Sequence, residues 1–176
     1  MPLLKDNAFV ADVWVHVEAG QIVPDAGRIV VGFERLANEW DSLVKFPGVL
    51  GTRLANTTRV QELQPYLSQL ALIILPFPAF NDGRAYSLAR QLRLDGYRGE
   101  IRGSGNILPD QLQFMQQVGI DSYEVTERFP LEVWQRASRQ MSLAYQRGLF
   151  RHANEREVWS ERHQGFAPWE EQPHAG

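Results

Sequence analysis

The amino-acid sequence predicts an α/β fold, with a mostly parallel sheet built from repeated βα units. After residue 48, strand-like segments alternate with helical segments of about 10 to 15 residues, the pattern of right-handed βαβ units. Residues 72–75 form a continuous apolar run bounded by prolines, as expected of a strand buried on both faces. A complete eight-unit barrel needs about 250 residues, and the chain has 176. We therefore expect an open Rossmann-like sheet or a half-barrel.

The N-terminal part is expected to form a strand pair followed by a helix. Residues 10–17 alternate between apolar and polar side chains, as a half-buried strand does. Turn-forming residues at 24–27 separate this strand from a second one at 28–33, and the two are predicted to form a hairpin. Apolar residues then recur at helical spacing from Phe33 to Val44, and the helix ends before Pro47.

The remaining elements alternate regularly along the chain. Strands are predicted at 49–54, 72–75, 99–102 and 122–125, between the helical segments, and the apolar run at 72–75 is expected in the centre of the sheet. Helical periodicity predicts helices at 58–70, 82–95, 108–118 and 130–148. Thr58 and Gln61 are spaced as a capping box at the start of the first of these helices, which Pro65 kinks or shortens.

The regular pattern dissolves near residue 150. We therefore expect a single α/β domain over residues 1–150 and a polar C-terminal tail over residues 151–176. Trp159 and Trp169 lie in this tail, which is expected to dock on a partner or on a second subunit. Three tail histidines recur every eleven residues: His152, His163 and His174. That spacing is not the i, i+4 spacing of a helical metal pair, so no metal site is expected.

Composition and charge exclude several classes of protein. The formal net charge of −3 and the pI near 5.8 lack the basic excess of a dedicated nucleic-acid binder. The absence of cysteine removes disulfides, thiolate nucleophiles and cysteine-ligated iron–sulfur clusters. The N-terminus shows no targeting pattern, and the longest apolar run, residues 70–80, is too short to span a membrane. We therefore expect a cytoplasmic protein that binds neither nucleic acid nor membrane.

Two arginines are expected at the carboxyl ends of the strands, where open α/β sheets bind their ligands. Arg84 follows one buried strand, and Arg102 ends the next. If these strands are neighbours, the two guanidinium groups approach each other beside two helix N-termini, a suitable place for phosphate, sulfate, sulfite or a carboxylate. The alternative is that Asp82 only caps its helix and that the arginines are solvated or paired with Glu100 and Asp110.

Residues 103–108 partly match the GxGxxG fingerprint of dinucleotide-binding proteins. They follow a predicted strand and precede a predicted helix, and an acid, Glu124, lies about 20 residues further on. Leu108 occupies the third glycine position. The alternative is a pair of ordinary turn glycines before a helix. The sequence contains no P-loop, GxSxG or HExxH motif, so a standard hydrolase is not supported.

Four segments in the middle of the chain carry a family resemblance. They are FNDGRAYSLARQLR at 80–93, GYRGEIR at 96–102, GNILPDQL at 105–112 and GID at 119–121. These segments resemble the domain-of-unknown-function 934 family of bacterial proteins, which is labelled as a probable oxidoreductase and linked to sulfite reduction. The chain departs from the family pattern at Ala85, Asn106 and Val118, where the family commonly has Gly, Asp and Cys. At these three positions the resemblance therefore gives no support for a catalytic role.

The resemblance implies a place in assimilatory sulfur metabolism and a shared site. The site residues that it implies are Asp82, Arg84, Arg90, Arg93, Glu100, Arg102, Asp110 and Gln111, and the loop residues Gly105 and Asn106 complete the expected ligand-binding set. We expect an accessory protein that binds sulfite reductase, its electron donor or a sulfur oxyanion through residues 82–84 and 102–106. Two alternatives stay open: a small oxidoreductase of sulfur assimilation that uses a nucleotide or flavin, and a non-catalytic protein that docks through its tail. A homodimer is compatible with each.

Overall fold

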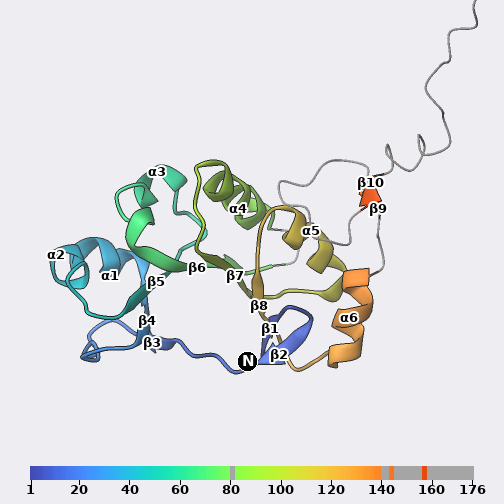
Figure 1. Ribbon diagram of the computed structural model, residues 1–176, viewed down its shortest axis with the longest axis horizontal. Helices are drawn as coiled ribbons and strands as arrows, with labels where there is room; N and C mark the ends of the chain where they lie inside the picture. Colours follow the sequence, from blue (N-terminus) through green and yellow to red (C-terminus); the bar gives the residue numbers. More distant parts are fainter. Residues whose placement is uncertain (80–81, 140–142, 145–155, 158–176) are drawn as a thin grey trace, which may run out of the picture.

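The computed structural model describes residues 1–79, 82–139, 143–144 and 156–157, and an eight-stranded sheet is its main feature (Figure 1). The strands of this sheet are β1 (Leu3–Lys5), β2 (Ala8–Val10), β3 (Val15–Val17), β4 (Arg28–Gly32), β5 (Val49–Arg53), β6 (Leu70–Phe77), β7 (Glu100–Gly105) and β8 (Ser122–Glu124). The helices are α1 (Phe33–Asn38), α2 (Trp40–Leu43), α3 (Val60–Leu63), α4 (Arg84–Leu94), α5 (Leu112–Gln117) and α6 (Leu131–Arg139), with the 3-10 helices η1 (Leu67–Gln69) and η2 (Pro109–Gln111). Two further strands, β9 (Leu143–Ala144) and β10 (Arg156–Glu157), pair in parallel with each other.

The sheet is a mostly parallel half-barrel. Strands β3 to β8 lie in the order in which they occur in the chain, and each pairs in parallel with the next. Because every right-handed crossover advances in the same direction, helices α1 to α5 all lie on one side of the sheet (Figure 1). A doubly wound sheet would reverse its strand order at one point. The predicted α/β fold is therefore confirmed, and of its two forms the chain adopts the half-barrel.

The main hydrophobic core lies between the helices and the convex outer face of the sheet. Ile73 and Leu75, at alternate positions of β6, are completely buried in this core. Helix α4 contributes Ala85, Ala89 and Leu92, which share one helix face as the sequence predicts. This packing fixes α4 on the sheet and so determines where its first turn lies.

The N-terminal segment crosses the concave inner face of the half-barrel. Residues 11–14, which we call the strap, connect β2 at one edge of the sheet with β3 at the other. The five peptide links between Val10 and Val15 reach at most about 18 Å. Seven strand spacings in a flat sheet would span about 34 Å. The sheet must therefore curl for the strap to reach from edge to edge.

Trp14 is the strap residue that fills part of the inner face. It packs with Val30, Leu72 and Ile74 in a second, smaller core. Gly51 of β5 makes room for this packing, because a Cβ atom there would lie 3.0 Å from Leu72 Cβ and 3.2 Å from the Trp14 ring. This part of the inner face is therefore covered by the protein's own chain.

The predicted hairpin between residues 10–17 and 28–33 is wrong. β3 and β4 pair in parallel, and residues 10–17 divide between the end of β2, the strap and β3. The antiparallel N-terminal pair is β1 with β2, joined by Asp6 and Asn7 in the left-handed backbone region with φ of 49° and 60°. Alternating apolar residues identify a strand, but they carry no information on its direction or its partner.

Several predicted boundaries also differ from the structure. The predicted capping box is absent: α3 begins at Val60 without a side-chain cap and ends at Leu63, before Pro65. β7 continues to Gly105, three residues beyond its predicted end. The predicted helix at 130–148 corresponds to α6 over Leu131–Arg139, whereas residues 143–144 form β9. Most of the predicted tail, residues 151–176, lies outside the described residues.

Candidate functional site

The ten residues expected to share one site are divided among several places in the structure. Four lie where the parallel strands end: Asp82, Arg84, Gly105 and Asn106. Two lie on the inner face of the sheet: Glu100 and Arg102. The other four lie on helices α4 and η2: Arg90, Arg93, Asp110 and Gln111.

Asp82 and Arg84 form a tight pair at the start of α4. Arg84 donates from Nε to Asp82 Oδ1 (2.9 Å) and from Nη2 to Asp82 Oδ2 (2.6 Å), and its backbone N–H also donates to Oδ1 (3.2 Å). The side-chain and backbone hydrogen bonds from Arg84 hold the pKa of the Asp82 carboxyl well below its usual range. Asn56 Nδ2 donates to the same carboxylate (3.2 Å). Asp82 thus orients Arg84, while 58% of the Arg84 side chain stays exposed.

Gly103 to Asn106 belong to the end of β7 and to the tight turn that follows it. Gly105 has a φ of +122°, and a Cβ there would lie 2.4 Å from the carbonyl oxygen of Phe77. Asn106 donates from Nδ2 to the carbonyl oxygen of Pro78 (3.0 Å). A Cβ at Gly103 would lie 2.8 Å from Met115 Cε. Close packing therefore accounts for both glycines. The GxGxxG fingerprint requires an open turn at these residues, but residues 103–105 belong to strand β7.

Arg102 has different partners from Arg84. It lies in the interior of β7, and its buried guanidinium group binds Asp12 (2.8 Å), Glu100 (3.1 Å) and Glu124 (3.5 Å). Among the described residues, Arg84 and Arg102 share no hydrogen-bond or ion-pair partner. The expectation of a common site assumed that Arg102 ends its strand. Because β7 continues for three residues, this side chain lies inside the half-barrel.

A connected set of polar side chains occupies the inner face beside Trp14. We call it the inner-face network, and it comprises Asp12, Arg53, Glu100, Arg102, Ser104, Ser122 and Glu124. Glu124 accepts hydrogen bonds from Arg53 Nη2 (3.0 Å) and Ser104 Oγ (2.5 Å). The network joins β5, β7 and β8 to the strap, because Asp12 belongs to the strap.

Glu100 anchors the side of the network that faces β1. Its carboxylate accepts hydrogen bonds from Ser122 Oγ (2.6 Å) and Lys5 Nζ (2.8 Å). Burial by itself raises the pKa of Glu100, but the hydrogen bonds from Lys5, Ser122 and Arg102 outweigh it and lower the pKa overall. Glu100 therefore carries a negative charge near neutral pH, and this charge offsets part of the buried positive charge of Arg102.

The hydrogen bonds of the network indicate a structural role. Among the described residues, no buried side-chain nitrogen or oxygen lacks a hydrogen-bond partner. Asp12, His16 and Glu124 each offer a potential metal-ligand atom within 4.8 Å of the others. Two of these three residues already bind the Arg102 guanidinium group, which would repel a cation placed between them. We interpret the network as a clamp that holds the strap on the sheet.

The four residues on α4 and η2 have other surroundings. Arg93 donates to the carbonyl oxygens of Tyr97 (3.0 Å), Gly99 (2.8 Å) and Gly119 (2.8 Å), at the edge where β7 and β8 begin. Gln111 Oε1 accepts a hydrogen bond from the backbone N–H of Leu108 (3.1 Å). The other two, Arg90 and Asp110, are exposed. Arg93 therefore supports the fold at the edge opposite to Arg84.

A pocket of about 640 Å³ lies where β5 and β6 end, and we call it the edge pocket. The residues that line it are Asn56, Thr57, Thr58, Arg59, Val60, Gln61, Pro76, Arg84, Ala85, Ser87, Leu88 and Gln91. Two of these described residues are cationic, Arg59 and Arg84, and none carries a carboxylate. The pocket also borders the first turn of α4, whose backbone N–H groups have no carbonyl partner within the helix and favour negative charge. Its chemistry suits an anion.

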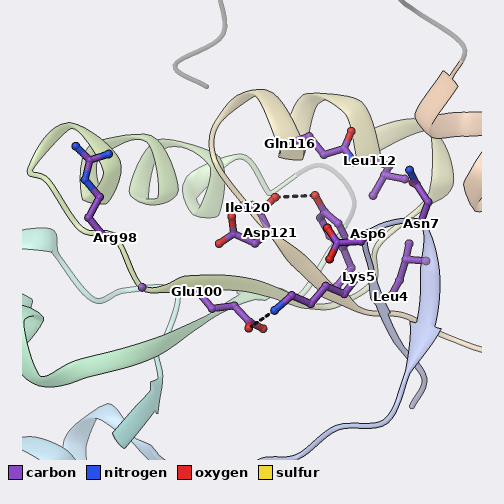
Figure 2. A pocket seen from close by; sticks show the side chains of 12 residues that line it. Leu4, Lys5, Asp6, Asn7, Arg98, Glu100, Leu112, Gln116, Ile120 and Asp121 are labelled. Carbon is purple, nitrogen blue, oxygen red and sulfur yellow. Dashed lines mark hydrogen bonds and ion pairs between the residues drawn. The ribbon is translucent and has the colours of Figure 1, made fainter. Parts of the chain in front are cut away.

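A second pocket, of about 390 Å³, lies at the opposite edge of the sheet, beside the β1–β2 hairpin (Figure 2). In Figure 2, Lys5 reaches across to Glu100, and Arg98 lies on the far side of the pocket from Asp6 and Asn7. Three carboxylates line this pocket, those of Asp6, Glu100 and Asp121. Two cations also line it, Arg98 and Lys5, and Lys5 is paired with Glu100 at 2.8 Å, so the carboxylates outnumber the cations. This pocket is therefore less suited to an anion than the edge pocket.

The fold and the pocket together define a class, an α/β half-barrel with a cationic pocket at the carboxyl edge of its strands. The family model described as bacterial protein of unknown function (DUF934) matches residues 51–155, more than half of the chain. The protein belongs to this family, which confirms the predicted resemblance. A comparison with curated proteins finds no match. Over the part of the chain that the structure describes, no helix has the length and apolar character needed to cross a membrane.

Sequence reasoning missed several residues of the network and of the pocket. His16 is not among the expected site residues because it lies far upstream of the predicted site, yet in the structure it lies 3.6 Å from Asp12 of the inner-face network. Arg53 and Arg59 flank a short loop in which the sequence indicates only a helix cap, at Thr58. One signal was available in the sequence, because polar residues occupy every second position of two strands. They are residues 100, 102 and 104 in β7 and residues 122 and 124 in β8, and this alternation indicates a polar inner face.

Proposed function

We propose that the protein is an accessory protein of assimilatory sulfite reduction that binds an anion, in the first place a sulfur oxyanion, in the edge pocket. The observation that carries the proposal is the presence of both Arg59 and Arg84 in a pocket whose described lining contains no carboxylate, Asp82 binding Arg84 from outside that lining. The link to sulfite reduction comes from the resemblance of residues 80–121 to the family, and the pocket supplies the anion chemistry that such a role needs.

The two arginines are suited to bind an anion in complementary ways. Asp82 binds Arg84 through Nε and Nη2, so Nη1 and the exposed edge of the guanidinium plane remain directed away from this partner. Arg59 is exposed and has no side-chain partner among the described residues. Arg84 therefore supplies an oriented cation and Arg59 an adaptable one. A bidentate guanidinium contact recognises sulfite, sulfate, phosphate and carboxylate.

Calorimetric titration with sulfite, sulfate and phosphate tests the anion site. We expect saturable binding to the wild type, and Arg59→Gln and Arg84→Gln should each weaken it at least ten-fold. Arg90→Gln is the matched control, because Arg90 is an exposed arginine of the same helix that does not line the pocket. Equal weakening by all three variants would indicate a general charge effect and would contradict the proposed site.

Affinity purification tests the accessory role. The tagged protein is expressed in its native bacterium grown with sulfate as the sole sulfur source, and bound proteins are identified by mass spectrometry. We expect sulfite reductase or its electron donor to be recovered with the wild type and lost with Arg84→Gln. Arg102→Ala is unsuitable here, because Arg102 is buried and supports the strap. Recovery of neither protein would overturn the accessory role and leave the anion site to be judged by calorimetry.

A further inference from the structure

We infer that the natural ligand of the edge pocket is an organic phosphate or sulfate ester with a neutral body about the size of a nucleoside, rather than a bare inorganic oxyanion. This inference rests on the anion site proposed above and names the class of ligand that fits it. The size of the pocket, the distribution of its charge and the chemistry of its uncharged lining support it.

The pocket is too large for an inorganic oxyanion alone. Its volume is about 640 Å³. A water molecule takes about 30 Å³ of liquid volume, so a tetrahedral oxyanion of five heavy atoms occupies on the order of 100 Å³. Pockets of about 300 to 1,000 Å³ are typical of sites for organic ligands and cofactors. An oxyanion would therefore fill one end of this pocket and leave the rest to solvent.

Among the lining residues that α4 contributes, the one cation, Arg84, lies at the start of the helix. Along α4, the lining residues Arg84, Leu88 and Gln91 recur at helical spacing and so lie on one face of the helix. Seven residues of α-helix rise about 10 Å. Along α4, the Arg84 cation is thus about 10 Å from Gln91, a neutral side chain whose amide donates to Asp95 (2.7 Å). A ligand that matches this face has an anionic head and a neutral body of similar length.

The uncharged lining suits an amphipathic body. Val60, Pro76 and Leu88 supply apolar surface against which a ring can pack. Other lining residues carry amide or hydroxyl groups, which recognise neutral hydrogen-bonding groups: Asn56, Thr57, Thr58, Gln61, Ser87 and Gln91. A bare oxyanion has no use for the apolar surface or for side-chain acceptors. A nucleoside has apolar ring faces together with hydroxyl and ring donors and acceptors.

Competitive titration with matched ligands tests the inference. The probes are inorganic phosphate, adenosine, AMP and flavin mononucleotide. Phosphate represents the anionic head alone and adenosine the neutral body alone, whereas AMP and flavin mononucleotide join a phosphate to two different bodies. We expect at least one of the two organic phosphates to bind at least ten-fold more tightly than both phosphate and adenosine. Arg84→Gln should weaken phosphate and the organic phosphate alike. Leu88→Asn should weaken only the organic phosphate, and Leu94→Asn, an exposed position of α4 outside the pocket, should change neither.

The outcomes separate this inference from the proposed function. If phosphate or sulfite binds in an Arg84-dependent way and neither organic phosphate binds more tightly, the inference is overturned and the anion site stands. If an organic phosphate binds more tightly but Leu88→Asn has no effect, the body lies elsewhere and the inference is also overturned. If no probe shows binding that depends on Arg59 or Arg84, both proposals fall.

Discussion

Arg102 shows how one buried charge organises the inner face of the half-barrel. Its side chain is 1% exposed and faces three carboxylates, those of Asp12, Glu100 and Glu124. A buried ion pair contributes little net stability when compared with a well-packed apolar replacement. Removal of one partner, in contrast, leaves the remaining charges buried and uncompensated. Within this network, substitution of Arg102 is therefore expected to reduce the stability of the fold most.

Arg102→Met is expected to destabilise the protein by about 3 to 5 kcal/mol, because three carboxylates lose their shared cation while the apolar volume is roughly kept. Denaturant unfolding measures the change in free energy. Arg90→Met, at an exposed position of α4, should change the stability by less than about 0.5 kcal/mol. A change of under 1 kcal/mol for Arg102→Met would show that the network is not a clamp.

The strap is the element that distinguishes this half-barrel from an open sheet. Its Asp12 binds Arg102 over β7, and its Trp14 packs on Val30, Leu72 and Ile74 of β4 and β6. The Arg28 guanidinium group lies over the Trp14 ring, 5.8 Å from its centroid. Polar and apolar contacts therefore hold the strap at two separate points across the inner face.

Trp14→Ala is expected to cost about 3 to 5 kcal/mol of stability, as is typical of a buried tryptophan, because it leaves Leu72 and Ile74 without cover. Thermal or chemical unfolding measures this cost. Val13→Ala serves as the control on the same strap, because Val13 is 62% exposed and should have little effect. Equal stability of the two variants would show that Trp14 does not fill a core.

Local patterns predicted the elements of the central sheet better than those at its edges. The apolar run at 72–75 lies within β6, because continuous apolar sequence is typical of a buried parallel strand, and the predicted strand at 49–54 corresponds to β5. β1 has three residues, too few for a periodic signal. The direction of β3 could not be predicted, because it depends on the strap that carries the chain across the sheet.

Only part of the candidate site could be predicted. Arg84 lies in the edge pocket because it follows a strand that was correctly identified. The face of the sheet on which the Glu100 and Arg102 side chains lie depends on which alternate residues of β7 point inward. That direction is known only once the strand boundary is known. Asp12 and His16 reach the inner face through a connection that spans the whole sheet, and no local pattern encodes such a path.

At the scale of the whole molecule, ionised carboxylates couple stability to pH. Hydrogen bonds with Lys5, Ser122 and Arg102 lower the pKa of Glu100 in spite of its burial, and Arg84 lowers that of Asp82. A carboxyl whose pKa is lower in the folded state stabilises the fold fully above its unfolded pKa. This stabilisation is lost as the pH falls through the folded pKa. The protein should therefore lose stability on the acid side.

We expect the free energy of unfolding to decline as the pH falls below about 4.3, the ordinary pKa of a glutamate. Glu100→Gln should lower the stability at neutral pH by roughly 1.5 to 3 kcal/mol, because it removes a charged hydrogen-bond acceptor, and should make the acid decline shallower. Glu62→Gln, at an exposed position of α3, should leave the profile as in the wild type. Denaturant unfolding at a series of pH values gives the profiles, and parallel curves for Glu100→Gln and wild type would contradict the expectation.

The position of β1 next to β8 has a consequence for the order in which the chain is made. Strands β3 to β7 each find a neighbour that is synthesised next, so the sheet can extend as the chain emerges. Leu3, in contrast, pairs with Glu124, and Lys5 pairs with Ser122. β1 can therefore pair with β2 at once, but it cannot pair with β8 until more than a hundred further residues have been made. The β1–β2 pair thus joins the rest of the sheet only after β8 has been made.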